Sequence, residues 1–323
     1  MIAGGTDQDF SLLVFHFRIK SQTGFAIDMK LISRVWKWPV YGWFGLILAI
    51  TFWILNWSLS GLRTQWGFFP MWLGYCLAVD AMVFARKGHS LLTRSPISYA
   101  ALFLISVPAW WLFEIINLRT QNWYYMGEQY FTDAQFLLFS SLSFSTVMPA
   151  VFGTAELAST FTWIKGIKCK LRFEITPAGL IALFAAGLTM LLLMLLWPAY
   201  FFCFVWLSLY LILEPLNFRL KNRTLLQYIS MGNWQPLLAL WVGCIICGFF
   251  WEMWNFYSYP KWIYYIPFFN FLHIFEMPLP GYFGYIPFSM ELFAIYHLAI
   301  GLLKPGRLHD YIRISQNDDG TAV

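Results

Sequence analysis

Long apolar runs alternate with short polar or aromatic connections along the chain. Each run is long enough to cross a bilayer about 30 Å thick at about 1.5 Å of rise per helical residue. The runs cover residues 41–60, 68–86, 97–118, 136–164, 176–198, 201–218, 235–256 and 282–303. The pattern predicts an all-α fold, a polytopic membrane helical bundle of about eight transmembrane helices.

The positive charges are distributed unevenly among the connections. If the N-terminus lies inside, only Arg63, Arg119 and Lys261 fall in outer connections, and all other Lys and Arg residues fall in inner ones. This asymmetry is the one that the positive-inside rule describes. We therefore expect a multi-pass protein of the bacterial inner (cytoplasmic) membrane with both termini cytoplasmic.

The composition agrees with a membrane protein and excludes an ordinary soluble domain. Of 323 residues, 59% are hydrophobic, 21% aromatic and 11% charged, with a mean hydropathy of +0.60. Soluble domains carry about 25% charged residues. The net charge of +5 comes from Lys and Arg in the connections, so it reflects topology and indicates no nucleic-acid partner.

The first 37 residues are polar and basic, and we expect a cytoplasmic N-terminal segment without a secretory signal peptide. Met29, followed by Lys30 and Leu31, also resembles a translation start. Whether residues 1–28 are translated therefore stays open.

Two parts of the chain share one pattern. Glu114-x-x-Asn117 precedes Trp123-x-Tyr125 as Glu252-x-x-Asn255 precedes Trp262-x-Tyr264, and residues 69–92 align without gaps on 203–226. The alignment predicts a first membrane repeat at 38–172, a second at 173–306 and a cytoplasmic tail at 307–323. Four spans return the chain to its starting side, so the two four-helix repeats should be parallel and related by an axis along the membrane normal.

The acids inside the spans form matched pairs. Asp80 and Glu214 lie toward the inner face, seven residues before Lys87 and Lys221. Because seven residues are two helical turns, each acid and lysine share a helix face. For this pair we expect a structural role as an ion pair or topology anchor.

The other two pairs are the candidate catalytic residues. Glu114 and Glu252 fall one turn before the outer ends of their spans, with an Asn on the same face that can bond the carboxyl. Glu156 and Glu291 fall near mid-span, and no Lys or Arg lies inside a span to neutralise them. Intramembrane acids are expensive and usually functional. The hypothesis is that a protonated acid donates to a substrate; the alternative is a neutral Glu bonded to a neighbouring helix.

The outer aromatic connections supply the candidate substrate-binding residues. Trp and Tyr also anchor spans at membrane interfaces, but the connection 256–281 is unusually rich in aromatic residues and proline. We expect it to cap a cleft between the repeats, where aromatic faces suit a long unsaturated lipid or a cationic centre formed from it. The candidates are Asn117, Trp123, Tyr125, Asn255, Trp262 and Tyr264.

The sequence offers no cofactor or metal signature. Cys244 and Cys247 have CxxC spacing but lie in an apolar span, which favours buried packing thiols over a redox or metal site. No Glu-x-x-His pair, phosphate-binding loop or nucleotide fingerprint is present. We therefore expect neither metal nor cofactor.

The order of motifs in the second repeat resembles carotenoid-pathway membrane enzymes. A Glu near a helix end, Trp262-x-Tyr264, Ile286-Pro287 and Glu291 followed by Leu-Phe are similar to the heterodimer-type lycopene cyclases and related carotenoid hydratases. Those cyclases carry two adjacent acids just after the Pro, whereas Phe-Ser-Met separates Pro287 from Glu291 here. The whole chain also resembles a group of uncharacterised bacterial polytopic membrane proteins with WEMWN-type and FEMPLPG-type segments.

The resemblance implies a cofactor-independent integral membrane enzyme. It would act on a hydrophobic isoprenoid-type lipid by proton transfer, as a cyclase, hydratase or isomerase. Glu291 would protonate a C=C bond and Glu252 would accept a proton in return. A proton-coupled transporter or carrier, with the acids as a relay, and a non-catalytic membrane assembly factor are the alternatives.

Overall fold

The computed structural model describes residues 38–167, 172–303, 311–315 and 318. It contains 8 helical spans long and apolar enough to cross a membrane, which confirms the predicted polytopic bundle. They are α2 (Val40–Ser58), α3 (Thr64–Lys87), α5 (Pro96–Thr120), α6 with α7 (Asp133–Phe144, Val147–Ser159), α9 (Pro177–Leu196), α10 with η2 and α11 (Pro198–Phe201, Phe202–Phe204, Val205–Arg219), α13 (Gln235–Phe256) and η3 with α14 (Leu279–Gly284, Tyr285–Leu303). The predicted N-terminal segment 1–37 lies outside the described residues.

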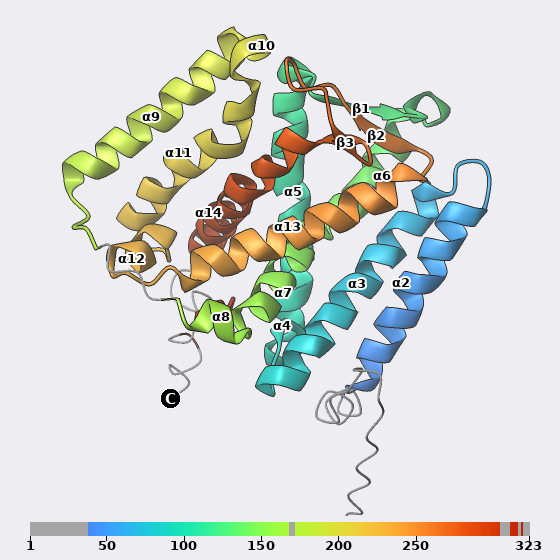
Figure 1. Cartoon of the computed structure of the whole chain (residues 1–323), viewed down its shortest axis with the longest axis horizontal. Helices are drawn as coiled ribbons and strands as arrows, with labels where there is room; N and C mark the ends of the chain where they lie inside the picture. The colour runs from blue at the N-terminus through green and yellow to red at the C-terminus, as the bar shows by residue number, and fades with distance from the viewer. Residues whose placement is uncertain (1–37, 168–171, 304–310, 316–317, 319–323) are drawn as a thin grey trace, which may run out of the picture. The chain divides into compact units, whose positions relative to one another are not determined.

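Short elements lie at both ends of the bundle. The end that holds the predicted inner connections carries the short helices α4 (Leu91–Arg94), α8 (Thr162–Lys165) and α12 (Leu225–Ser230), and we call it the basic end. The opposite, aromatic end carries β1 (Trp123–Met126), η1 (Glu128–Tyr130), β2 (Lys261–Tyr264), β3 (His273–Ile274) and β4 (Met277–Pro278). Figure 1 shows α4, α8 and α12 toward the bottom and the β1–β2 ribbon toward the top.

Close helix packing depends on small residues. At the crossing of α7 and α13, a Cβ placed on Gly243 would lie 2.6 Å from the backbone nitrogen of Ala155. Apolar side chains gain little from leaving lipid for a helix interface. Close backbone approach and van der Waals contact therefore hold such crossings together.

Buried carboxyls fix the turns at the basic end. Asp80 accepts hydrogen bonds from the Leu92 N–H at 3.0 Å, the Ser90 hydroxyl at 2.6 Å and the Tyr41 hydroxyl at 2.8 Å. Glu214 accepts from the Leu226 N–H at 2.6 Å, also twelve residues later in the chain. Both acids therefore anchor the turn that follows their own helix.

The lysine predicted to pair with Asp80 has another contact. Lys87 donates to the Arg313 carbonyl at 3.1 Å. Asp80 is satisfied by hydroxyl and amide donors, so the expected Asp80–Lys87 ion pair is wrong. Asp80 lies two turns before the end of α3 at Lys87, and the chain folds back there so that Ser90 and Leu92 reach its carboxyl.

The C-terminal segment is built into the basic end. Ile312 and Ile314 are fully buried, and the Ile312 carbonyl accepts from Arg223 at 2.5 Å. Arg223 also forms a buried ion pair with Asp318 at 2.5 Å. Within the predicted cytoplasmic tail 307–323, the described residues 311–315 and 318 pack against the bundle.

Candidate functional site

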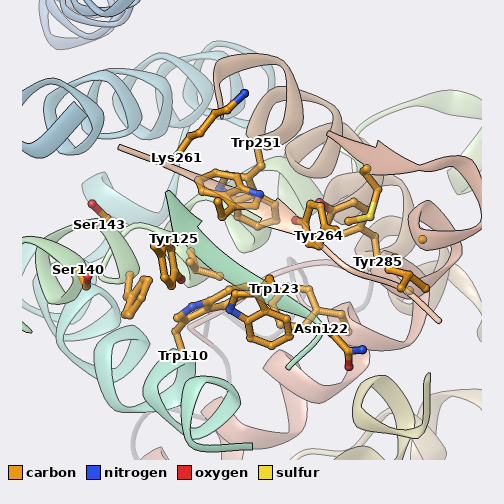
Figure 2. Close-up of a pocket in the computed structure, with 18 of the residues that line it drawn as sticks. Trp110, Asn122, Trp123, Tyr125, Ser140, Ser143, Trp251, Lys261, Tyr264 and Tyr285 are labelled. Carbon is orange, nitrogen blue, oxygen red and sulfur yellow. The ribbon is translucent and has the colours of Figure 1, made fainter. Parts of the chain in front are cut away.

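A cavity of about 530 Å³ lies beneath the β1–β2 ribbon at the aromatic end. Its wall is formed largely by aromatic rings from the ribbon, from α5, α6, α13 and α14, and from the start of α11. Figure 2 shows Trp110, Trp123, Tyr125, Trp251 and Tyr264 around it. Ligand sites in proteins are commonly apolar hollows of this size with a few placed polar groups.

The ribbon brings together the two Trp-x-Tyr motifs. Trp123 lies opposite Tyr264 and Tyr125 lies opposite Trp262 in an antiparallel pair. Side chains of opposed residues, and of residues two apart on one strand, share a face. All four aromatic side chains therefore project from one face of the ribbon, and all four line the cavity.

Glu252 lies behind the ring of Tyr264 on the ribbon and the ring of Tyr285 on α14. It is fully buried on α13, and one carboxyl oxygen accepts hydrogen bonds from the Tyr264 hydroxyl at 2.8 Å and the Tyr285 hydroxyl at 2.6 Å. Its second oxygen has no hydrogen-bond partner among the described residues. Both tyrosine rings border the cavity, whereas the carboxyl does not. Any proton transfer between Glu252 and a ligand in the cavity must therefore pass through the hydroxyl of Tyr264 or Tyr285.

Glu114 occupies the corresponding position in the first half, with different partners. It accepts from the Tyr125 hydroxyl at 2.5 Å, from Trp110 Nε1 at 2.8 Å and from Trp123 Nε1 at 3.1 Å. The Trp123 indole also reaches the second carboxyl oxygen at 3.3 Å. Both oxygens of Glu114 thus accept hydrogen bonds, in contrast to those of Glu252.

The two asparagines hold the ribbon. Asn117 Nδ2 donates to the Trp123 carbonyl at 2.7 Å, and Asn255 Nδ2 donates to the Trp262 carbonyl at the same distance. Each Asn Oδ1 accepts from the backbone N–H of the same Trp, at 3.3 and 3.0 Å. Neither asparagine lines the cavity. They position the aromatic wall, and the expected bond from each Asn to its neighbouring carboxyl is not formed.

Neither Glu156 nor Glu291 lines the cavity, and the two acids have different partners. Glu156 is fully buried, forms an ion pair with Arg94 and accepts from the Arg313 N–H at 2.7 Å. The expectation of an apolar, uncompensated position near mid-span is therefore wrong for Glu156. Glu291 is also fully buried, and accepts from the Leu209 N–H at 3.2 Å.

The ribbon tyrosines remain protonated at physiological pH. Burial, followed by the nearby Glu252 carboxyl, raises the pKa of Tyr264 well above its usual range. Burial and Glu114 do the same to the pKa of Tyr125. Each phenol is therefore available as a hydrogen-bond donor or proton relay, and neither serves as a resident phenolate.

Sequence analysis missed Tyr285, which donates to Glu252 from α14. A Cβ on Gly248 would lie 2.4 Å from the Tyr285 ring, so the missing side chain leaves a slot for that ring. Gly248 and Glu252 are four residues apart and share a helix face. The glycine one turn before a buried acid could have indicated that a side chain packs there, but the sequence does not show that this side chain is Tyr285.

The cysteines and histidines form no metal site in the part of the chain that is described. No group of three or more His, Cys, Asp or Glu side chains comes together there. Cys244 and Cys247 are buried thiols, and Cys247 lies 3.4 Å from the Thr154 hydroxyl. These contacts are those of packed core residues.

Comparisons with protein-family models, curated proteins and solved structures return no match to this chain.

Proposed function

We propose that this protein is a cofactor-independent membrane enzyme that acts on an isoprenoid-type lipid by proton transfer in the aromatic cavity. The observation that carries the proposal is the placement of Tyr264 and Tyr285. Both rings border the cavity, and both hydroxyls bond the buried Glu252. A proton can therefore pass between a shielded carboxyl and an apolar ligand without bulk water.

The chemistry balances within these groups. The Tyr264 hydroxyl, which donates to Glu252 Oε1 before the reaction, turns to donate its proton to one carbon of a C=C bond, and the carboxyl turns to give its own proton from Oε2 to the phenolate oxygen. A C–H bond forms, and the other alkene carbon becomes a cation. Loss of a proton from an adjacent carbon back to the phenol–carboxylate pair forms a new double bond, so no net proton, electron or cofactor is consumed.

The cavity wall suits the cation that this step creates. Trp110, Trp123, Trp206 and Trp251 present indole rings to the space, and aromatic faces attract a cation by about 0.5–2 kcal/mol each. The carboxyl group of Glu114, which accepts hydrogen bonds on both oxygens, lies behind Trp123 and Tyr125. The resemblance to carotenoid cyclases and hydratases, based on the Trp262-x-Tyr264 and Pro287/Glu291 pattern, supports the same substrate class.

Deuterium incorporation tests the proposal. Purified protein in liposomes would be supplied with membrane prenyl lipids and carotenoids in D2O, and the lipids would be analysed by mass spectrometry. Protonation at carbon leaves deuterium in the product, and Glu252→Gln should abolish that mass shift. Glu214→Gln, the same change outside the cavity, should keep it. An absence of deuterium in every lipid with wild-type protein would overturn the proposal.

We also propose that the two halves are copies of one unit and that the basic end faces the cytoplasm. The matched contacts support the duplication: Asp80 and Glu214 each anchor the turn twelve residues later, and Asn117 and Asn255 each bracket a Trp backbone. The distribution of Lys and Arg supports the sidedness.

A proton-coupled carrier is the second candidate, and Glu291 favours it. This acid is fully buried outside the cavity, and one of its oxygens has no hydrogen-bond partner among the described residues. Such an oxygen can hold a transferable proton. Proton flux in proteoliposomes that Glu291→Gln removes, together with unchanged lipids, would favour the carrier.

A further inference from the structure

The cavity wall reaches the protein surface at two differently composed rims. Four of the lining residues are exposed: Glu128, Cys203, Phe269 and Phe283. Glu128 follows β1, and Gln65 near the start of α3 is a second polar lining residue. The other three gather where η2 and the start of α11 meet the connection between β2 and α14. There the Phe202 and Phe269 rings are 6.5 Å apart, and Gly284 packs on Trp206.

The apolar rim continues into an exposed aromatic segment. Between Lys261 and Glu276 no residue carries a formal charge at neutral pH when His273 is neutral. Lys261 and Glu276 form an ion pair with each other and so neutralise the base of this segment. Phe268 is 71% exposed and Phe283 is 70% exposed. Apolar area of this kind in water is unfavourable by about 25 cal/mol per Å², and contiguous patches of it mark interaction surfaces.

The bilayer is the partner that fits this surface. The segment joins the aromatic ends of two apolar spans, α13 and α14, so it lies at the level of the boundary between lipid tails and headgroups. Next to the apolar rim, the ring of Phe268 stacks on the ring of Tyr200 of α10 with 6.0 Å between the ring centroids, which continues the apolar surface onto a neighbouring span. Uncharged aromatic side chains favour the interface between lipid tails and headgroups.

We propose that the cavity opens sideways into the bilayer between Cys203, Phe269 and Phe283, and that its ligand is an amphiphile that enters from the membrane. The ligand lies with its apolar end toward this mouth and its polar end toward Gln65 and Glu128. The inference extends the proposed function by naming the route and orientation of its substrate, and it rests on that function only for the reaction.

Fluorescence quenching tests the mouth without any turnover. Phe283→Cys and, separately, Phe269→Cys would be labelled with an environment-sensitive fluorophore in a protein carrying Cys169→Ser and Cys203→Ser, and reconstituted in liposomes. Met126→Cys, on the outer face of the ribbon near the polar rim and 40% exposed, is the matched control. Lipids with a spin label on the acyl chain should quench the mouth labels and spare the control, whereas aqueous iodide should quench the control alone.

Two outcomes would overturn the inference. Iodide quenching at positions 269 and 283 would show that the mouth opens to water. Protection from both quenchers, with emission that changes with the protein-to-lipid ratio, would place a second copy of the chain over the mouth. Lipid quenching combined with no deuterium incorporation would leave the lateral mouth in place and remove only the proposed enzyme activity.

Discussion

Tyr124 of β1 lies directly opposite Ile263 of β2. On either side of this pair, Trp123 faces Tyr264 and Tyr125 faces Trp262, so exchanging the two strands reproduces the same set of aromatic pairs. An antiparallel ribbon with this property has a local twofold axis between its two central residues. The two Trp-x-Tyr motifs therefore pair symmetrically over the cavity, which supports the proposed duplication.

The register of the ribbon can be tested by cross-linking. Cysteines at positions 124 and 263 lie opposite each other, with Cβ atoms about 4.5–5.5 Å apart, so a short bifunctional thiol reagent should join them. A slip of one residue moves a side chain to the other face. Cysteines at 124 and 262 should therefore cross-link poorly, and equal yields for both pairs would refute the register.

Removing the proton-exchanging acid should affect turnover more than removing its counterpart. Glu252 has an oxygen free to carry a proton, whereas both oxygens of Glu114 are occupied by donors. We expect Glu252→Gln to slow deuterium incorporation by about 10²–10⁴-fold, as loss of a general acid or base does. Glu114→Gln should slow it less. Equal losses would mean that the two carboxyls act as a pair.

The phenol should matter as a relay and not merely as part of the wall. Tyr264→Phe keeps the ring and removes the hydroxyl that bonds Glu252 at 2.8 Å. We expect a loss approaching that of Glu252→Gln, with binding of the lipid retained in a sedimentation assay. Tyr99→Phe, a buried tyrosine outside the cavity wall, is the control. Normal turnover in Tyr264→Phe would assign the relay to Tyr285.

Glu156 should prove structural. Its carboxyl compensates Arg94 and accepts the Arg313 N–H, and breaking a buried ion pair costs about 3–5 kcal/mol. Glu156→Gln should lower the midpoint of thermal unfolding in detergent, while the folded protein keeps its turnover. Glu276→Gln, in a pair with side chains about one-fifth exposed, should lower the midpoint much less. A stable but inactive Glu156→Gln protein would restore a catalytic role.

The helix crossing at Gly243 should tolerate no added side chain. A methyl group there would meet the Ala155 backbone at 2.6 and 2.8 Å, so α7 and α13 would have to separate. We expect Gly243→Ala to destabilise the protein by about 1–3 kcal/mol, the usual range for overpacking. Gly153→Ala, whose Cβ would meet only Val79 at 3.7 Å, should leave the thermal midpoint nearly unchanged.

Much of the architecture was encoded locally in the sequence. Span positions, the all-α bundle and the positions of the buried acids follow from apolar run length and from the cost of a charge in lipid, which any segment shows by itself. The two Trp-x-Tyr motifs were also recognisable, because their spacing recurs with Glu and Asn in front of them.

Only the tertiary structure decided which of these residues work together. Glu252 and Glu156 are both acids inside apolar spans, yet one meets two phenols at the cavity wall and the other meets Arg94 at the basic end. The Tyr285–Glu252 and Arg94–Glu156 contacts join residues 33 and 62 positions apart, and hydropathy and spacing carry no information about such partners. The fold determines whether a buried acid meets phenols or an arginine, and the partner that reaches its oxygens sets what the carboxyl can do.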